Sequence, residues 1–406
     1  MQCVDDMKPT FAMRLVVVSH VVHYRFAGQL FAYGPYAREM ALWAELFAEI
    51  AIASPCRTER PPADALPLEA DNISILPQVE AGGETFRAKL ELLAWLPVMI
   101  VRLVRALATA DAIHVRCPGN LGLLGAALAP LFGKPLIAKY AAQWSDAPGE
   151  GRLVRLQKRL LASAWWRGPV TVYGEWPDQP AHVVPFFTSL LSAEQMERAR
   201  AAAGRKRSRT SSNVLYTGRL SRSKHVDTVL RALAAARRAG CPMTATVVGE
   251  GPERASLEAL AEELRIEDAV EFTGGLTFED VLERLERADI LALVSETEGW
   301  PKAIAEGMAF GLIAIGSDRG FVPKMLAEGR GFVVTPGNSE ELVRCFLEIA
   351  RNPEHCDRIR RAAADWAQQF SLEGLREAIR KLLLASWKTS APAAGIVPIE
   401  EKRETL

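Results

Sequence analysis

Glu298 and Glu306 stand with seven residues between them, in a segment of the chain that is rich in small side chains. The apolar run at residues 290–294 predicts a buried strand, and Pro301 predicts that a helix begins just after the following loop. The backbone N–H groups of Gly299, Trp300 and Lys302 would then lie unpaired at a helix N-terminus, where they can bind hydroxyls or a phosphate. Glu306 would lie about one and a half turns into that helix, where a carboxylate can accept two vicinal hydroxyls.

The same two glutamates have a simpler interpretation, as a surface acid in a loop and an acid that interacts with the helix dipole. That interpretation leaves the small size of Gly307, Ala309 and Gly311 without a reason. Small residues allow another backbone or a ligand to approach closely. We therefore favour a binding site over two surface acids.

A second group of residues, Gly218, Arg219 and Lys224, follows the apolar run at residues 213–217. Gly218 permits a tight turn after a strand, and the two cations flank the start of the next helical pattern. Cations beside helix N–H groups form a site for a pyrophosphate. A pair of solvent-facing cations is the alternative, and these residues alone favour neither.

The composition is that of an ordinary globular chain. Of the 406 residues, 49% are hydrophobic and 24% are charged, and the 49 basic side chains balance the 49 acidic ones. These values exclude a disordered or collagen-like chain, and the zero net charge argues against a globally basic nucleic-acid-binding protein. The six cysteines show no CxxC or Cys/His metal spacing, so we expect reduced thiols and no metal site. Because no basic region precedes an apolar run at the N-terminus, we expect no secretory signal and a cytoplasmic protein.

Short apolar runs alternate with helical patterns along almost the whole chain. Uninterrupted apolar runs are typical of strands buried on both faces of a parallel sheet, and strands separated by helices form right-handed βαβ units. The sequence therefore predicts an α/β protein with two doubly wound parallel-sheet, Rossmann-like domains facing across a cleft, where ligands bind. Strands are expected at residues 14–19, 50–53, 73–76, 112–115, 136–140, 170–173, 213–217, 244–248, 270–273, 290–294, 312–315 and 331–334.

A polar, basic interval at residues 198–212 separates the two series of strands. A solvated linker accounts for its charge better than a nucleic-acid site does. We therefore expect the N-terminal domain at residues 1–197, the linker at residues 198–212 and the C-terminal domain at residues 213–370.

The C-terminal half resembles the retaining glycosyltransferases of family 4, which have the GT-B architecture. Glu298 and Glu306 fit the E-x7-E signature of that family. Gly218, Arg219 and Lys224 fit its phosphate-binding signature, and the segments at residues 248–252, 270–274 and 288–290 match its connecting segments in order. The resemblance extends over about residues 213–375, and several motifs in the expected order make it specific.

This resemblance implies roles for individual residues. Arg219 and Lys224 would bind the diphosphate of a nucleotide-sugar donor. Glu306 would hold the ribose hydroxyls, Glu298 would touch the transferred sugar, and the backbone around residues 273–276 would contact the base. Glu298, Arg219 and Lys224 are the expected catalytic residues. The expected donor-binding set is Gly218, Arg219, Lys224, Thr273, Leu276, Glu298, Gly299, Trp300, Pro301, Lys302 and Glu306.

The N-terminal half resembles the family less. Where the family often has a glycine-rich loop, this chain has a single glycine, Gly28, and Arg116 stands where many members have a histidine. Arg116 stays protonated and cannot act as a base at neutral pH, but it can bind a phosphate or carboxylate. The acceptor-side candidates are His23, Gly28, Arg116, Lys139, Gln143 and Trp144. Ordinary loop or helix-capping roles account for any single one of them equally well.

The activity implied by the resemblance is transfer of a sugar from a UDP- or GDP-sugar to a hydroxyl with retention of configuration, in surface polysaccharide or glycoconjugate biosynthesis. The acceptor would be a glycan, a lipid-linked molecule or a small molecule. No DxD motif is present, and because GT-B enzymes generally use cations in its place, we expect no metal and no cofactor. The alternatives are a UDP-N-acetylglucosamine epimerase or hydrolase of the same architecture and a non-catalytic nucleotide-sugar-binding relative.

The C-terminal helical pattern at residues 372–387 has Leu375, Ile379 and Leu383 on one face, and Ser371 can cap its start. In GT-B relatives such a helix crosses back to the N-terminal domain, so we expect residues 371–388 to do so. Residues 389–406, rich in Ala, Pro and charge, are expected to be a disordered tail.

The most apolar stretch, residues 92–107, carries Arg102 and Arg105 and is interrupted by Pro97, so it falls short of a bilayer span. With Arg87 and Lys89 before it, the stretch could be a basic amphipathic helix that contacts anionic lipid. A helix that covers the sheet of the N-terminal domain accounts for the same pattern, and we favour it.

Overall fold

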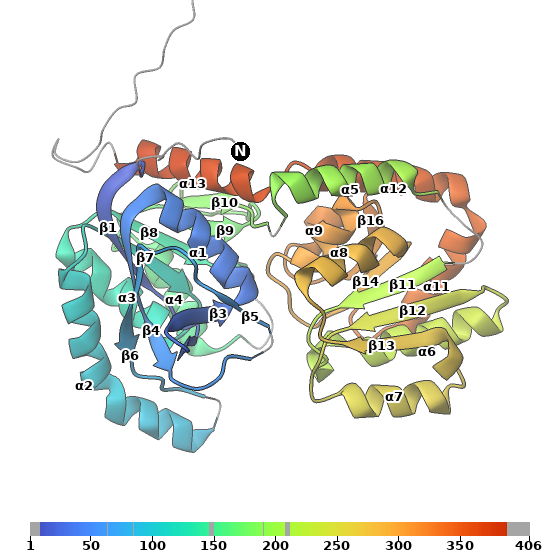
Figure 1. Cartoon of the computed structure of the whole chain (residues 1–406), viewed down its shortest axis with the longest axis horizontal. Helices are drawn as coiled ribbons and strands as arrows, with labels where there is room; N and C mark the ends of the chain where they lie inside the picture. Colours follow the sequence, from blue (N-terminus) through green and yellow to red (C-terminus); the bar gives the residue numbers. More distant parts are fainter. Residues whose placement is uncertain are drawn as a thin grey trace, which may run out of the picture. The chain divides into compact units, whose positions relative to one another are not determined.

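The computed structural model describes residues 9–62, 64–83, 85–145, 150–189, 191–207 and 212–387 of the chain. They form two compact units, each built on its own sheet (Figure 1). The described residues of unit 1 lie within 9–141, 150–186 and 376–387, and those of unit 2 within 142–145 and 187–375. The expected tail at residues 389–406 lies outside the described residues.

Unit 1 is built on a sheet whose central strands are parallel. Its strands follow the order β10, β9, β8, β7, β1, β4, β2, β3 and β5, and β6 pairs with β4. In β1 the apolar run from Leu15 to Val18 is fully buried, as expected for a strand covered on both faces. The bounds are β1 Phe11–Val18, β2 His23–Phe26, β3 Gln29–Tyr33, β4 Phe47–Arg57, β5 Ala65–Pro67, β6 Ile73–Gln78, β7 Ala112–Cys117, β8 Leu136–Tyr140, β9 Val170–Tyr173 and β10 Val183–Phe186.

The helices of unit 1 cover both faces of its sheet. Helices α2 (Phe86–Ala108), α3 (Asn120–Leu128) and α4 (Arg152–Ala162) follow β6, β7 and β8, and each leads to the next strand in one direction across the sheet. Right-handed crossovers made in one direction place their helices on the same face. Helix α1 (Gly34–Leu46) leads from β1 to β4 in the opposite direction and covers the other face.

The hairpin of β2 and β3 was not expected from the sequence. Its two strands pair antiparallel, with His23 opposite Ala32, and are joined by Ala27 and Gly28. Ala27 has φ 50° and Gly28 has φ 80°, which are the left-handed values that a two-residue hairpin turn requires. Gly28, expected on the acceptor side as part of a loop, therefore forms an exposed hairpin turn instead.

Unit 2 is a doubly wound parallel sheet with the strand order β13, β12, β11, β14, β15 and β16. Its strands agree with the expected runs to within one or two residues, which confirms the predicted α/β class. The strands are β11 Ser212–Thr217, β12 Met243–Val248, β13 Val270–Gly274, β14 Ile290–Leu293, β15 Ile313–Ser317 and β16 Gly331–Val334. The helices are α5 Ala193–Arg205, α6 Val226–Arg238, α7 Arg254–Glu263, α8 Phe278–Arg287, α9 Lys302–Ala309, α10 Val322–Leu326, α11 Ser339–Arg351 and α12 Pro353–Ala367.

The boundary between the units differs from the expected linker at residues 198–212. Helix α5 occupies Ala193–Arg205, and a capping box formed by Ser192 and Gln195 starts it. Arg198 forms an ion pair with Glu286 of α8, so the basic residues of this interval hold the helix to unit 2. The chain leaves unit 1 after residue 186.

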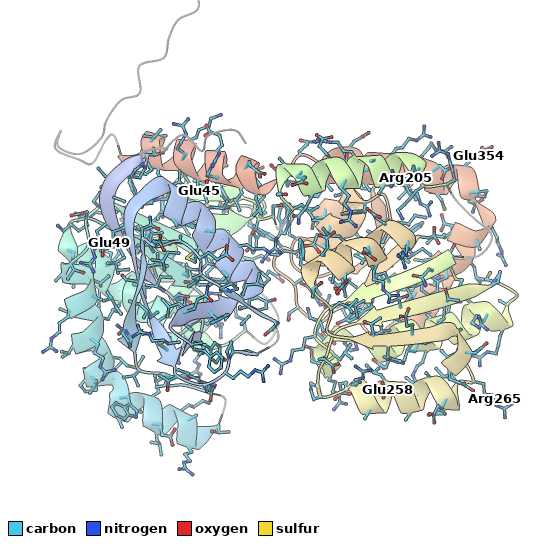
Figure 2. All side chains as sticks on the ribbon, viewed as in Figure 1. Glu45, Glu49, Arg205, Glu258, Arg265 and Glu354 are labelled. Atoms are coloured by element: carbon cyan, nitrogen blue, oxygen red, sulfur yellow. The ribbon has the colours of Figure 1, made fainter. Side chains whose placement is uncertain are left out.

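Helix α13 (Leu372–Trp387) starts in unit 2 and belongs to unit 1 from residue 376 onward. Ser371 Oγ accepts a hydrogen bond from Gly374 N at 3.0 Å and caps the first turn. Within unit 1, Arg376 forms an ion pair with Glu45 of α1, which is labelled in Figure 2. Trp387 is buried, its indole N–H donates to the carbonyl of Leu136 at 3.1 Å, and its ring packs against two phenylalanines, Phe11 and Phe47. The last turn of α13 is therefore part of the core of unit 1.

We predict that Trp387→Ala lowers the free energy of unfolding of unit 1 by about 3–5 kcal/mol, because it leaves a large cavity and removes the partner of a buried carbonyl. Trp95→Ala, at an exposed position of α2, is the matched control and should change it by about 0.5 kcal/mol or less. Denaturant unfolding followed by circular dichroism measures both variants. Equal effects would show that α13 does not contribute to the core of unit 1.

Candidate functional site

The centre of unit 2 is a topological switch point between β11 and β14. From β11 the chain continues outward to β12 and β13, then returns to β14 on the other side of β11 and continues outward to β15 and β16. Strands β11 and β14 are parallel neighbours, with Val214 opposite Ile290, so the loops that follow both strands lie at the same edge of the sheet. In open α/β sheets, this edge at the switch point is where ligands bind.

The loop after β11 approaches the loop after β12 closely. A Cβ on Gly249 would lie 1.9 Å from the carbonyl oxygen of Gly218, so only glycine fits at position 249. Gly218 N donates to Val248 O at 3.0 Å, and Tyr216 Oη donates to Arg219 O at 2.9 Å. These contacts hold the backbone of the turn while the Arg219 side chain stays exposed. No ion pair of Arg219 occurs within the described part of the chain.

Lys224 and Glu298, both expected at the donor site, are in direct contact. Lys224 Nζ lies 2.7 Å from Glu298 Oε1, although the residues are 74 positions apart in the chain. Glu296 N donates to Ser223 O at 2.8 Å, which ties the loop after β14 to the turn that carries Lys224. The pair is only partly buried, and the Lys224 side chain keeps contact with solvent. A ligand with more negative charge than one carboxylate can therefore reach its ammonium group.

The segment at residues 320–321, which the sequence did not single out, packs against the loop at residues 298–302. A Cβ on Gly320 would lie 1.8 Å from the carbonyl oxygen of Glu298, and Phe321 N donates to Gly299 O at 3.2 Å. Gln143, an acceptor-side candidate, accepts a hydrogen bond from Gly320 N at 3.2 Å through its side-chain oxygen. Residues 142–145, including the buried Trp144, cluster with unit 2 rather than with the sheet that precedes them.

Trp300 is fixed by an aromatic cluster. Its ring stacks on Phe321 at a centroid distance of 5.2 Å and on Trp366 at 5.9 Å, and Phe370 packs edge-on against it at 5.4 Å. Pro301 is the N-cap of α9, and Lys302 is the first residue of the helix. We expected Pro301 to lie within the first helical turn, so the helix begins one residue later than expected. The backbone of residues 299–302 is thus a rigid turn at the start of a helix.

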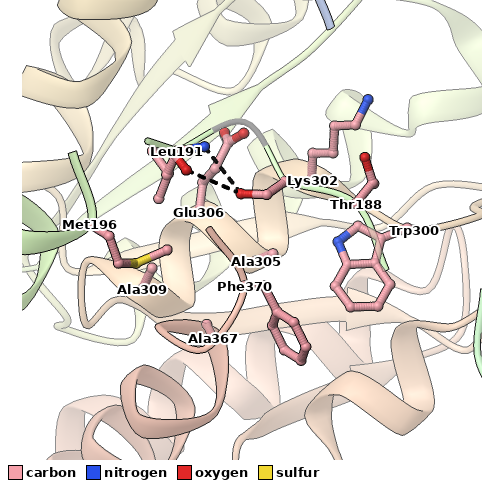
Figure 3. A pocket seen from close by; sticks show the side chains of 11 residues that line it. Thr188, Leu191, Met196, Trp300, Lys302, Ala305, Glu306, Ala309, Ala367 and Phe370 are labelled. Carbon is pink, nitrogen blue, oxygen red and sulfur yellow. Dashed lines mark hydrogen bonds between the residues drawn. The ribbon is translucent and has the colours of Figure 1, made fainter. Parts of the chain in front are cut away.

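Glu306 lies on α9 and is buried, with 7% of its surface exposed. With Lys302, Trp300, Thr188 and Phe370 it lines a pocket of unit 2 (Figure 3). A carboxylate in such a partly apolar pocket is suited to hydroxyl groups, because their hydrogen bonds satisfy its oxygens without adding a second charge.

Thr273 and Leu276, expected near the base, lie at and just after the end of β13. The hydroxyl of Thr273 donates to Gly274 O at 3.0 Å, and Gly249 N donates to the same carbonyl at 2.9 Å. The ends of β11, β12 and β13 are therefore joined in sequence by backbone contacts. The loops that carry the expected donor residues other than Glu306 thus follow parallel strands that end at one edge of the unit 2 sheet.

Two acceptor-side candidates, Arg116 and Lys139, lie side by side in unit 1 because they are register partners on β7 and β8. Both bind the carboxylate of Glu39 on α1. Arg116 does so through two hydrogen bonds of 2.6 and 3.2 Å, and Lys139 through one of 2.8 Å. We call Glu39, Arg116 and Lys139 the unit 1 ion cluster. All three residues are buried.

Glu39 stays ionised in this cluster. Burial raises its pKa, but the charges of Arg116 and Lys139 and their hydrogen bonds outweigh burial, so the pKa lies well below its ordinary value. The Arg116 guanidinium also lies 4.9 Å from the centre of the Tyr36 ring. Two cations on one carboxylate leave the cluster with one excess positive charge.

His23, another acceptor-side candidate, is fully buried at the start of β2 instead of lining a site. Its Nδ1 lies 2.9 Å from Val21 O and 2.7 Å from Ser54 Oγ. Burial lowers the pKa of His23 to about 4, against a smaller opposite effect of its hydrogen bond to Val21. The imidazole is therefore neutral at pH 7 and serves the core of unit 1.

The sequence did not single out Glu39 of the unit 1 ion cluster, or Gly320 next to the 298–302 loop of unit 2. Glu39 lies 77 residues before Arg116 and resembles any acid in an amphipathic helix. Gly320 is one glycine among 29, and only its position behind the 298–302 loop distinguishes it. Both depend on contacts between distant segments, which no local spacing reveals.

Comparison with known proteins gives one family match. Residues 199–366 match the family model "Glycosyl transferases group 1". An uncharacterized glycosyltransferase of Haemophilus influenzae is 33% identical over 143 residues, which are 35% of this chain and 40% of that protein. The alpha-D-kanosaminyltransferase of Streptomyces kanamyceticus is 29% identical over 39% of this chain and 42% of its own. The chain thus spans about two fifths of the length of these curated relatives.

Solved structures of similar fold cover almost the whole chain. The crystal structure of Anabaena HepE in complex with UDP and glucose has a TM-score of 0.66 at 17% identity, and covers 92% of this chain and 100% of its own. Sucrose-phosphate synthase of Thermosynechococcus elongatus has a TM-score of 0.67 at 19% identity, with coverages of 93% and 100%. In fold over most of its length, and in sequence over residues 199–366, the chain is similar to GT-B glycosyltransferases.

Proposed function

We propose that this chain is a glycosyltransferase that moves a sugar from a nucleoside-diphosphate sugar to a hydroxyl group, and that it belongs to family 4 and retains the anomeric configuration. The observation that carries the proposal is the contact between Lys224 and Glu298 at the switch point of unit 2, with the exposed Arg219 five residues before Lys224 in the same loop. Two cations and one carboxylate within a few residues of a helix N-terminus suit a phosphorylated sugar, which has both negative charge and hydroxyls.

The comparisons support this substrate class. Structures of Anabaena HepE contain UDP, UDP-glucose, or UDP with glucose. A putative colanic acid biosynthesis glycosyltransferase of Salmonella typhimurium and an amylovoran biosynthesis glycosyltransferase of Erwinia amylovora are similar to this chain over parts of their length. We therefore propose a UDP- or GDP-sugar donor and a role in surface polysaccharide or glycoconjugate biosynthesis.

In the proposed reaction the bond between the anomeric carbon and the diphosphate oxygen breaks, and the acceptor oxygen forms a new bond from the same face. The departing diphosphate oxygen accepts the proton of the acceptor hydroxyl. Arg219 and Lys224 stabilise the negative charge that grows on the diphosphate, so we propose that the reaction needs no metal and no cofactor. Glu298 would orient the sugar, and Glu306 would bind the ribose hydroxyls.

The acceptor would be a glycan, a lipid-linked molecule or a small molecule, bound by residues of unit 1. The unit 1 ion cluster has one more cation than anions, which favours an acceptor with a negative group near Arg116. We propose that the reaction takes place in the cytoplasm, with the enzyme peripheral on the inner face of the membrane.

A binding screen tests the substrate class. UDP, GDP, ADP and their sugars should be compared by calorimetry and thermal shift, since a ligand specific for the folded state raises the melting temperature by mass action. We expect one base to be preferred. Binding of NAD without binding of any nucleoside diphosphate would overturn the proposal, and nucleotide release without an acceptor would favour the epimerase or hydrolase class.

Arg219→Ala and Lys224→Ala should each lower kcat by about 100-fold or more with the donor found in that screen, because a charge-assisted bond to the leaving group is lost. Arg222→Ala is the matched control, since Arg222 is an exposed cation in the same turn. Its kcat should stay within about twofold of wild type. If the first two variants behave like the control, the diphosphate assignment is wrong.

Glu306→Ala should weaken binding of the free nucleoside diphosphate, because the ribose contact does not require the sugar. Glu298→Ala should leave nucleotide affinity nearly unchanged or raise it, since it releases Lys224 from its partner, but should damage transfer. Calorimetry with the nucleotide and turnover with the nucleotide-sugar separate the two effects. Equal losses of nucleotide affinity would contradict this division of roles.

A further inference from the structure

Helix α2 has two halves that differ in burial. The residues from Met99 to its end bury Met99, Leu103, Ala106 and Leu107 in unit 1, as a helix that covers a sheet should. In residues 87–98 no side chain is buried, although eight of these twelve residues are apolar. Pro97 lies between the halves, and Figure 1 shows α2 bending away from the sheet toward its N-terminus.

The exposed side chains of α2 form an apolar stripe. Leu93 is 64% exposed, Val101 48% and Trp95 47%, which is unusual for large apolar side chains in one helix. Leu90, Leu93, Val101 and Val104 are spaced so that they share one face. The exposed large apolar residues of α2 are Leu90, Leu93, Trp95, Val98, Val101 and Val104.

The stripe is part of a wider surface on the same face of the unit 1 sheet. Leu131, in the short helix Ala129–Phe132 that contacts α2, is 66% exposed. Leu153 and Leu156 of α4 and Trp165 just after it are also exposed. Together with α2 they hold ten of the thirteen exposed large apolar residues in the described parts of the chain. We call this surface the α2–α4 face.

Basic residues lie among these apolar side chains. Helix α2 contains Arg87, Lys89, Arg102 and Arg105 but a single acid, Glu91. Helix α4 contains no acid, and its Arg152, Arg155 and Arg159 are exposed. The whole chain has a formal net charge of zero, so this concentration of positive charge is a local feature.

We propose that the α2–α4 face binds the surface of a bilayer that contains anionic phospholipid. At the boundary between headgroups and acyl chains, apolar side chains leave water while neighbouring arginines contact phosphates, and tryptophan is favoured there. Among the described residues, no helix is long and apolar enough to span a membrane, so the face would lie on the bilayer. This inference does not depend on the proposed sugar transfer.

Charge complementarity favours lipid over a protein partner. On the α2–α4 face, cations and apolar side chains are interspersed along both α2 and α4 instead of forming an apolar centre with a polar rim. A protein partner would normally bind an apolar centre, because each charged residue buried at the centre of a protein interface must be paired. A lipid surface supplies phosphates beside acyl chains at every position.

Flotation of the full chain with vesicles tests the proposal. We expect binding to vesicles of phosphatidylcholine mixed with phosphatidylglycerol, weak or no binding to phosphatidylcholine alone, and loss of binding at high salt because the charges are screened. Equal binding to both vesicle types, or binding to neither, would overturn the proposal.

Two sets of variants locate the surface. Arg102→Gln with Arg105→Gln should lower the affinity for anionic vesicles roughly 10- to 30-fold, and Val101→Glu should also lower it strongly. The matched controls are Arg231→Gln with Arg238→Gln on α6, and Val333→Glu at a similarly exposed valine of unit 2. If the α2 variants bind like the controls, or if the wild-type chain forms a dimer that Val101→Glu disrupts while vesicles stay unbound, the face does not bind lipid.

Discussion

The close approach of three loops at one edge of the unit 2 sheet is the constraint on which the proposed site depends. Parallel strands end at that edge together, and the reversal of strand order between β11 and β14 leaves the loops after both strands facing the same space. Gly249 lets two of these loops touch, and Gly320 supports the third from behind. Between these supported loops, Lys224 and Glu298 meet although 74 residues separate them in the chain.

The two groups of charges in the molecule differ in burial, and this decides what each can do. In the unit 1 ion cluster the carboxylate of Glu39 is buried and bound by two cations, so removing one partner would leave an uncompensated buried charge, at a cost of about 3–5 kcal/mol. The Lys224–Glu298 pair is only partly buried, with 27% of the Lys224 side chain exposed to solvent. A ligand can therefore reach the ammonium group of Lys224, whereas the cluster in unit 1 stays closed and can attract an anion only through its excess positive charge.

The sequence predicted the α/β class and most of the strands, because these depend on local patterns. Apolar runs mark buried parallel strands, and Glu298 and Glu306 keep a fixed spacing along one loop and helix. The charges of the interval around Arg198 predict a solvated linker, whereas the structure has a helix there whose Arg198 pairs with Glu279 and Glu286 of α8. The match to the family model from residue 199 onward also places this helix with the C-terminal half.

The features that the sequence did not predict depend on contacts between distant segments. His23 follows a strand, as a site residue would, but the hairpin that it starts folds back and buries it. The partner of Arg116 lies on a helix with no motif around it, and both halves of α2 are mostly apolar although only one of them is buried. In each case only the tertiary structure separates a core position from a surface one.

A crystal structure of the chain with a bound nucleoside diphosphate would test the central claim most directly. The account predicts that the diphosphate oxygens lie within hydrogen-bonding distance of Arg219 and Lys224, that Lys224 no longer relies on Glu298 alone, and that the ribose hydroxyls contact Glu306. A nucleotide bound away from the β11 and β14 loops, with the Lys224–Glu298 pair unchanged, would contradict the account.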